Sequence, residues 1–550
     1  MTGYLRVRGP GLGDALLWTA AWGLIMAVAL WSRPHLPVDE TRYLAVAWEM
    51  WLRQDWLVPH LNGEPYSHKP PLLFWLMNLG WALFGVNDWW PRLVAPAFGL
   101  GSLFLTARLA RALWPAAPGA ARLAPVVLVG ALFWTLYTSL TMFDMLLAFF
   151  TLVGLLGLVR AGRAYGSGAA AWGGFALFGL GIGLGVLAKG PAILLHVLPA
   201  ALAAPWWLPA VGAGAVPVPW RRWYGGVLGG VLLGAALSLV WAVSAGIAGG
   251  AEYREAIFWG QSAGRMVESF AHGRPWWWYL AVLPPLVLPW LIWPGLWRAA
   301  ARYDGDGGGD GGLRLIAVWF GVSFVAFSLI SGKQLHYLLP EFPALALVAA
   351  RVLDRGVPTR RWDMAPAVVL FGLFGLVLVA APLFADRLRL PHGIAPQGWW
   401  GLLVLAAAAA AWVARPVPVA LRLAGLSVAA VVALHLALAP ILWGVFDMGP
   451  AARQLARWEA QGYDLAHAAK YHGQFNFAGR LRRPIATIGL DRAETRAWLD
   501  THPRAKVISY RAHRPTDAVP DLILPFRGRF LVVWDAALVR ADPAIAARGT

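Results

Sequence analysis

The sequence of 550 residues has no cysteine and little charge. The lack of cysteine excludes disulfides, thiolate nucleophiles and Cys-ligated metals. Charged residues make up 13% of the chain, roughly half of the share usual in soluble globular proteins. The charge is also unevenly placed, because long uncharged stretches alternate with short Arg-rich ones up to about residue 446. This pattern excludes an ordinary soluble enzyme and predicts a mostly α-helical, polytopic membrane protein.

Hydrophobic residues, in contrast, make up 59% of the chain and include 34 Trp. A helix needs about 20 largely apolar residues to cross a bilayer, and this criterion predicts about thirteen spans. They lie roughly at 14–32, 92–108, 124–141, 145–160, 171–187, 190–208, 223–246, 279–297, 314–331, 337–351, 365–384, 398–414 and 420–443. One further apolar stretch, 71–87, begins after a Pro and is predicted to lie in the interface or to dip into the membrane.

Lys and Arg total 46 against 28 Asp and Glu, a surplus of +18. In a soluble chain such a surplus suggests a nucleic-acid partner, but here Arg gathers at the ends of apolar segments, where it sets membrane orientation. With Arg6 and Arg8 inside, Arg-rich and Arg-poor connections alternate. The alternation places loops 33–91 and 247–278 and the tail 447–550 outside the cytoplasm, and no nucleic-acid partner is expected.

The tail 447–550 is predicted to form a compact α/β domain after a membrane domain of residues 1–446. Polar amphipathic runs at 451–460 and 491–500 alternate there with short apolar runs such as AKVISY and RFLVVW, a pattern typical of helices packed on a sheet. Before it, the Gly/Asp-rich segment 305–312 is predicted to be a flexible connector on the inside.

Three acids stand out on the predicted outer face. Asp39 and Glu40 follow the first span, where they either cap the next helix or contribute to a site. Asp144 occupies an almost uncharged turn between two long apolar stretches. An ionisable group at that depth is costly and usually functional, with helix capping as the alternative.

Cations and aromatic residues lie on the same face. The chain has only five Lys among its 46 basic residues, and Lys69, Lys189 and Lys333 all fall at outer boundaries. Carboxylates beside such cations suit a phosphate-bearing lipid, because cations hold phosphate and acids orient or deprotonate an acceptor. The other candidates on this face are Arg42, Tyr43, Tyr66, Arg254, Arg265, Arg274, His336 and Tyr337.

Histidines and one glutamate in the outer loops offer the only metal candidate, which would use Glu64, His68 and His272. Their spacing matches no metal motif, and hydrogen-bonding roles are the alternative. A divalent metal at His68 and His272 is therefore kept only as a secondary interpretation.

The first outer loop resembles a known family. The runs PVDETRY at 37–43, QDWLVPHLNG at 54–63, YSHKPPL at 66–72 and FGV at 84–86 resemble the first extracytoplasmic loop of polyprenyl-phosphate-dependent GT-C glycosyltransferases. Within these they most resemble the lipid A 4-amino-4-deoxy-L-arabinose transferases. Phe143-Asp144, AKGP at 188–191 and KQLHYLLP at 333–340 fit the same family in the same order.

The resemblance implies a GT-C fold with about thirteen transmembrane helices and a periplasmic α/β domain, in a bacterial inner membrane. It implies an inverting transfer of aminoarabinose from undecaprenyl phosphate to a lipid A phosphate, which would confer resistance to polymyxin and other cationic antimicrobial peptides. It also implies that no cofactor is required. Asp39 and Asp144 would be the catalytic acids, and Lys69 and Arg254 would bind the donor phosphate. Further substrate contacts would be Glu40, Arg42, Tyr43, Tyr66, Lys189, Lys333 and Tyr337.

Two other functions use the same residues. Transfer of a hexose to protein Ser or Thr, as in the related O-mannosyltransferases, would require Asp39 to act as a true base. A lipid flippase or transporter would need no covalent chemistry. Transporters usually carry mid-span ionisable groups and internal pseudo-symmetry, whereas here the mid-span regions are nearly free of charge and no internal repeat is found.

Overall fold

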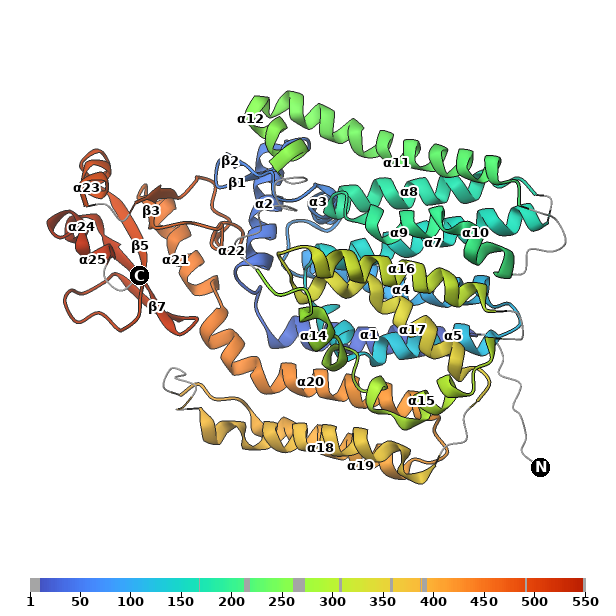
Figure 1. Ribbon diagram of the computed structural model, residues 1–550. Coiled ribbons are helices and arrows are strands. Elements are labelled where there is room, and N and C mark those ends of the chain that lie inside the picture. Colours follow the sequence, from blue (N-terminus) through green and yellow to red (C-terminus); the bar gives the residue numbers. More distant parts are fainter. Residues whose placement is uncertain are drawn as a thin grey trace.

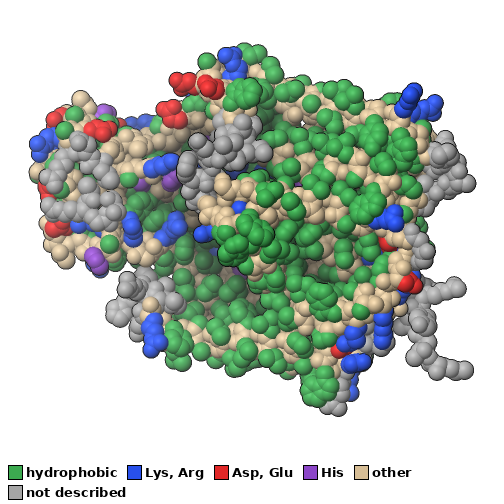
Figure 2. Space-filling view, in the orientation of Figure 1, with side chains coloured by type: hydrophobic (Ala, Val, Ile, Leu, Met, Phe, Trp, Pro, Cys, Tyr) green, Lys and Arg blue, Asp and Glu red, His purple; other side chains and the backbone are tan. Residues whose placement is uncertain are grey.

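The computed structural model describes residues 10–167, 169–211, 218–260, 273–305, 309–356, 360–385, 387, 393–489 and 492–547. The helices run side by side in one large bundle, and a C-terminal sheet lies at one end of it (Figure 1). Figure 2 shows hydrophobic side chains over the visible face of the bundle, with charged side chains at its ends and on the C-terminal part. An apolar belt between polar ends is the surface that a bilayer requires.

Nine helices of the described chain are long and apolar enough to cross a membrane, or ten if a bent pair counts as one span. They confirm a multi-pass membrane protein. Most of the nine are single helices, namely α1 (Leu12–Ser32), α4 (Trp89–Leu113), α7 (Phe143–Gly166), α8 (Trp172–Lys189), α11 (Trp220–Ala248) and α16 (Gly311–Leu329). The composite ones are η6 (Leu335–Glu341) with α17 (Phe342–Leu353), α18 (Ala365–Ala380) between η7 (Arg361–Met364) and η8 (Ala381–Phe384), and α20 (Val419–Phe446) continuing into α21 (Gly449–Ala460).

Every predicted span coincides with helix, but several spans are short or broken. These are α5 (Pro118–Gly130) with α6 (Leu132–Tyr137), the bent pair α9 (Ile193–Leu202) and α10 (Ala204–Trp207) with η1 (Leu208–Val211), α14 (Trp278–Leu286) with η4 (Trp290–Ile292) and α15 (Pro294–Ala301), and η9 (Gly398–Trp400) with α19 (Gly401–Val413). Proline explains the most fragmented stretch, since Pro284, Pro285 and Pro289 lack the N–H that continues a helix. The count of thirteen stays a prediction.

The stretch 71–87 forms α3 (Leu72–Phe84), a helix of 13 residues. It is about 20 Å long, less than the roughly 30 Å hydrocarbon layer. The helix packs against α2 (Asp39–Arg53), and the Asn78 amide donates to the Ala47 carbonyl at 3.0 Å. Its length agrees with the prediction that this stretch does not cross the membrane.

The C-terminal segment contains a five-stranded sheet in the order β4-β3-β5-β7-β6. Strand β3 pairs parallel with β4 and β5, while β5–β7 and β7–β6 are antiparallel. Apolar clusters cover both faces of the sheet. The elements are β3 (Asp464–Ala468), α22 (Asn476–Gly479), β4 (Ala486–Ile488), α23 (Arg492–Thr501), β5 (Ala505–Arg511), β6 (Leu522–Phe526), β7 (Arg529–Asp535), α24 (Ala536–Ala541) and α25 (Ala544–Ala547). The predicted α/β character is confirmed, although the sequence did not predict β3.

The C-terminal segment packs on the segment 33–91, which the sequence predicts to be the first outer loop (Figure 1). The Trp48 indole donates to the Leu481 carbonyl at 2.8 Å. The Asn62 amide both donates to and accepts from the Ile485 backbone, each time at 2.8 Å. Because these contacts join residues more than 400 positions apart in sequence, they hold the sheet against α2.

The end of the Gly/Asp segment is part of the packed structure. Asp310 caps α16 by accepting from the Leu313 amide at 2.9 Å, and it also accepts from Arg351 and the Trp114 indole, each at 2.7 Å. Gly312 lies against the Trp114 ring, where a Cβ would come within 2.6 Å. The predicted flexible connector is therefore wrong for 310–312, and 306–308 lie outside the described residues.

Candidate active site

The two acids of the first loop begin α2 and have opposite surroundings. The helix starts at Asp39 with Val38 as its N-cap, so neither acid is the cap residue. The Asp39 side chain is 51% exposed and accepts hydrogen bonds from Arg42 and, at 3.5 Å, from the Tyr43 hydroxyl. Asp39 is thus held in place while keeping open surface.

Glu40, in contrast, is 2% exposed and engaged by the protein. Arg33 binds both of its oxygens, and the backbone amides of Leu36 and Thr141 donate to them at 2.8 and 2.7 Å. Burial alone would raise the pKa of the Glu40 carboxyl, but Arg33 and the two amides lower it to about 2. This geometry does not support the predicted substrate contact; Glu40 instead ties α2 to the end of α1 and to the turn before α7.

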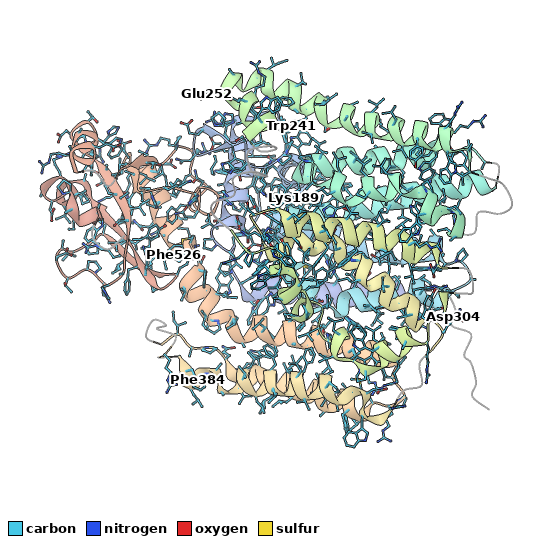
Figure 3. The ribbon with its side chains drawn as sticks, viewed as in Figure 1. Lys189, Trp241, Glu252, Asp304, Phe384 and Phe526 are labelled. Carbon is cyan, nitrogen blue, oxygen red and sulfur yellow. The ribbon has the colours of Figure 1, made fainter. Side chains whose placement is uncertain are left out.

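The second predicted acid meets a predicted lysine. Asp144, the second residue of α7, is 1% exposed and forms an ion pair with Lys189 at the end of α8. The Lys189 Nζ lies 4.8 Å from the Tyr337 ring centroid. Lys189 lies at the end of the bundle that faces the C-terminal sheet, while Asp304 marks the opposite end (Figure 3). Three residues predicted from separate segments are therefore brought together.

An aromatic group joins this pair to Asp39. The centroid of the Phe143 ring lies 4.8 Å from the ring centroid of Tyr43 and 5.6 Å from that of Phe74. The Lys69 Nζ lies 5.6 Å from the same Phe143 ring. Tyr43 bonds to Asp39 and Phe143 directly precedes Asp144, so both acids and both lysines belong to one cluster. We call Asp39, Lys69, Phe143, Asp144 and Lys189 the Phe143 cluster.

The other predicted side chains have mixed placements. Tyr66 is 5% exposed and stacks on His68 with ring centroids 5.3 Å apart. Lys333 is 3% exposed and donates to the carbonyls of Arg274 and Ile330, and burial lowers its pKa. The predicted substrate contact of Lys333 is therefore not supported, because its ammonium group binds backbone.

Arg254 lies at the edge of the described site. It belongs to the short helix α12 (Gly250–Glu255), is exposed, and packs its stem over Gly246. Among the residues that the structure describes it forms no ion pair. The adjoining residues 261–272, which include Arg265 and His272, lie outside the described chain, so the structure does not bring Arg254 into the Phe143 cluster.

The metal interpretation receives no support from the described residues, which contain no group of three or more His, Asp or Glu placed to hold an ion. Glu64 lies on the exposed hairpin strand β2 (Glu64–Pro65), which pairs with β1 (His60–Leu61), and His68 is exposed beside Tyr66. His272 lies outside the described residues, so the structure does not test its pairing with His68.

Sequence reasoning missed one buried ionisable pair. His196 of α9 and Glu341 at the end of η6 are both fully buried, with 2.5 Å between Nδ1 and Oε1. The pair joins the helix that follows Lys189 to the segment that carries Tyr337. Their positions inside apolar runs were the available signal, since ionisable side chains in membrane segments usually have a specific partner.

The chain is similar to known glycosyltransferases. A family model described as dolichyl-phosphate-mannose-protein mannosyltransferase matches residues 17–242. The undecaprenyl phosphate-alpha-4-amino-4-deoxy-L-arabinose arabinosyl transferase of Pseudomonas aeruginosa is 31% identical over 387 residues, which cover 68% of this chain and 65% of the relative. The protein of the same name from Serratia proteamaculans is 28% identical over 416 residues, covering 72% and 70%. The chain thus aligns with slightly less than two thirds of the first relative.

A solved structure extends the likeness to nearly the whole chain. The crystal structure of ArnT from Cupriavidus metallidurans bound to undecaprenyl phosphate superposes with a TM-score of 0.71 at 21% identity, covering 95% of this chain and 98% of that one. The apo form of the same protein gives the same TM-score of 0.71. These findings confirm the resemblance carried by the first-loop motifs: the chain is similar in sequence to the aminoarabinose transferases that use undecaprenyl phosphate, and it has their GT-C fold.

Proposed function

We propose that this chain is an inverting, polyprenyl-phosphate-dependent glycosyltransferase that moves 4-amino-4-deoxy-L-arabinose from undecaprenyl phosphate to a lipid A phosphate. The Phe143 cluster carries the proposal, because it joins two acids and two lysines at one end of an apolar bundle. ArnT from Cupriavidus metallidurans, which has a similar fold, was crystallised with undecaprenyl phosphate bound. We also propose that this end and the C-terminal domain, 447–550, face the periplasm from a bacterial inner membrane.

The proposed step needs no net proton transfer. An oxygen of the acceptor phosphate attacks C1 of the sugar, and the C1–O bond to undecaprenyl phosphate breaks with its electron pair left on the departing phosphate. The acceptor changes from a monoester dianion to a diester monoanion, and the donor changes in the opposite sense. Asp39 therefore has no need to act as a strong base; it positions groups or holds the cationic sugar amine.

The cations act on the charge that develops on the leaving phosphate. Lys69 and Arg254 would bind this phosphate, and preorganised cations of this kind stabilise the transition state. Asp144 would keep Lys189 in place through their ion pair. Arg42, Tyr43, Tyr66 and Tyr337 would line the substrates. No metal is assigned to the reaction.

The direct test is transfer by the purified full-length protein. Undecaprenyl-phosphate aminoarabinose and lipid A are supplied in detergent, and lipid A is followed by mass spectrometry for a pentose adduct. Asp39→Ala should abolish the adduct. The matched control is Asp304→Ala, which removes an acid that is 69% exposed at the opposite end of the bundle, and it should retain wild-type activity. An inactive wild type, or an active Asp39→Ala, would overturn the proposal.

A second candidate function is transfer of a hexose to protein Ser or Thr. The mannosyltransferase family model over residues 17–242 favours it. A hydroxyl must lose its proton during such a transfer, so Asp39 would then be a general base. Incubation with polyprenyl-phosphate mannose and a Ser/Thr peptide distinguishes the two, because modified peptide with unmodified lipid A would reverse the ranking.

A further inference from the structure

The loop between β3 and α22, residues 469–475, lies against the middle of α2. Gly473 has φ +78° and packs so closely that an added Cβ would come within 2.8 Å of the Ala45 Cβ and 2.6 Å of Leu61. Arg42 lies one helical turn from Asp39 and one turn from Ala45 on α2. The loop therefore packs on α2 within two turns of Asp39.

Hydrogen bonds fix the shape of this loop. The Gln474 side chain accepts from the His472 backbone amide at 3.1 Å and donates to the Tyr510 hydroxyl of β5 at 2.8 Å. The Tyr471 hydroxyl accepts from the Phe475 amide at 3.2 Å and donates to the Asn476 side chain. A loop held this firmly can present side chains at defined positions.

Lys470 and His472 are the basic side chains of this loop. Lys470 is exposed and forms no ion pair within the part of the chain that the structure describes. Burial lowers the pKa of the half-buried His472, Arg42 and Lys470 lower it further, and Asp39 raises it. His472 is therefore within electrostatic range of Lys470, Arg42 and Asp39. Its imidazole is neutral near pH 7, and in that form one ring N–H can still donate a hydrogen bond to a phosphate oxygen.

The small number of lysines also draws attention to Lys470. Lys470 is the fourth of only five lysines, after Lys69, Lys189 and Lys333. The fifth, Lys506, is paired with Asp521 and Asp535 at 2.7 and 2.8 Å. Lys470 is thus the one lysine of the C-terminal segment whose ammonium group is not already held by an acid of the described chain.

We propose that Lys470 and His472 bind the anionic phosphate of the acceptor, so that the C-terminal domain completes the active site and selects a phosphate-bearing acceptor. The inference rests on the proposed function. The membrane part supplies Lys69 and Arg254 for the donor phosphate, and a second phosphate needs cations of its own. Lys470 and His472 belong to a different segment of the chain, which packs on α2 through Gly473.

The charge flow in the reaction sets Lys470 and His472 apart from the cations that bind the donor phosphate. The acceptor phosphate loses one negative charge as it becomes a diester, so cations that hold it bind the ground state at least as tightly as the transition state. Their removal raises the acceptor KM and leaves kcat unchanged. Removal of a donor-side cation lowers kcat instead.

The test uses the full-length variants Lys470→Met and His472→Gln. The expected result is a rise of about 10- to 100-fold in the KM for lipid A, the equivalent of one lost charge-assisted hydrogen bond. The donor KM and kcat should stay within about two-fold. Lys470→Arg should restore most of the acceptor affinity. The matched control Arg496→Met, which removes an exposed cation from α23, should change nothing.

A binding measurement separates this inference from the proposed function. Lipid A and the same lipid A with its phosphates removed are titrated into wild type and both variants without donor. Phosphate-dependent binding that is lost in Lys470→Met supports the inference even if wild type transfers no sugar. Transfer by wild type with an unchanged acceptor KM in both variants, or an equal loss of kcat in them, would overturn it.

Discussion

The two ends of the helical bundle both hold carboxylates among cations, but they use them differently. At the end away from the sheet, Asp310 is 4% exposed and accepts from Arg351, Trp114, Tyr303 and the Leu313 amide. At the sheet end, Asp39 is 51% exposed and accepts only from Arg42 and Tyr43 among the described residues. A carboxylate with its oxygens fully engaged stabilises the fold, whereas one that keeps open surface can receive a substrate.

Neighbouring residues repeat this contrast within one helical turn. Glu40 follows Asp39 directly, and consecutive residues of a helix point about 100° apart. That rotation turns Glu40 towards Arg33 and the protein interior, while Asp39 stays at the surface beside Arg42. The comparison therefore predicts that substitution of Asp39 lowers activity, whereas substitution of Glu40 or Asp310 lowers stability.

The largest effect is expected at Asp39. Asp39→Asn keeps the size of the side chain but removes its charge, and kcat for transfer to lipid A should fall by about 100-fold or more. The thermal unfolding midpoint should stay close to that of wild type, because half of the side chain is exposed. A variant with a tenth or more of wild-type activity would show that Asp39 is not part of the reaction.

Asp310→Ala should produce the opposite result. The substitution leaves Arg351 and the Trp114 indole without their acceptor, and breaking a buried ion pair typically costs about 3–5 kcal/mol. The unfolding midpoint should drop clearly, while kcat per folded molecule stays unchanged. If Asp310→Ala instead loses activity at constant stability, the distinction between the two ends fails.

Glu40 should make stability depend on acid pH. Its folded pKa of about 2 lies below the value of about 4.3 for an unfolded glutamate. Its contribution, on the order of 3 kcal/mol, is therefore present above about pH 4.5 and lost as the pH falls towards 2. Unfolding midpoints measured from pH 7 to pH 3 should fall more steeply for wild type than for Glu40→Gln. Parallel curves would contradict the assignment.

The smallest effect is expected at an exposed pair. Arg355 and Asp304 are 45% and 69% exposed at the end away from the sheet, and ion pairs of this kind contribute little because water competes for both partners. Arg355→Ala should leave both the unfolding midpoint and the activity unchanged. A clear loss of stability or activity would mean that an ion pair of this protein can be important without being buried.

Much of this organisation follows from the sequence. Apolar length and Arg placement located the helices, and the short β-like runs of the tail predicted its sheet. A charged or polar group at a membrane boundary usually has a structural or functional role. This argument predicted Asp39, Lys69, Asp144, Lys189 and Tyr337 as site residues. These predictions depend on local composition, and local composition is what a single sequence displays.

Other features depend on which distant segments meet. Glu40 and Lys333 carry the same chemistry as the residues of the Phe143 cluster, but Arg33 and backbone carbonyls engage them. Pairing of this kind appears only once helices are packed. The same holds for His196 with Glu341, which are 145 residues apart.

The sequence alone determined that the chain enters a membrane, which face carries the unexplained charges, and which family it resembles, because hydropathy, charge and motifs are local properties. The tertiary structure decided which of those charged side chains stay exposed and which are buried and engaged by other groups of the protein. It also packed the loop that carries Lys470 and His472 on α2 across more than 400 residues, through the contact of Gly473 with Ala45. Long-range packing is set by shape complementarity between distant segments, and no local pattern encodes it.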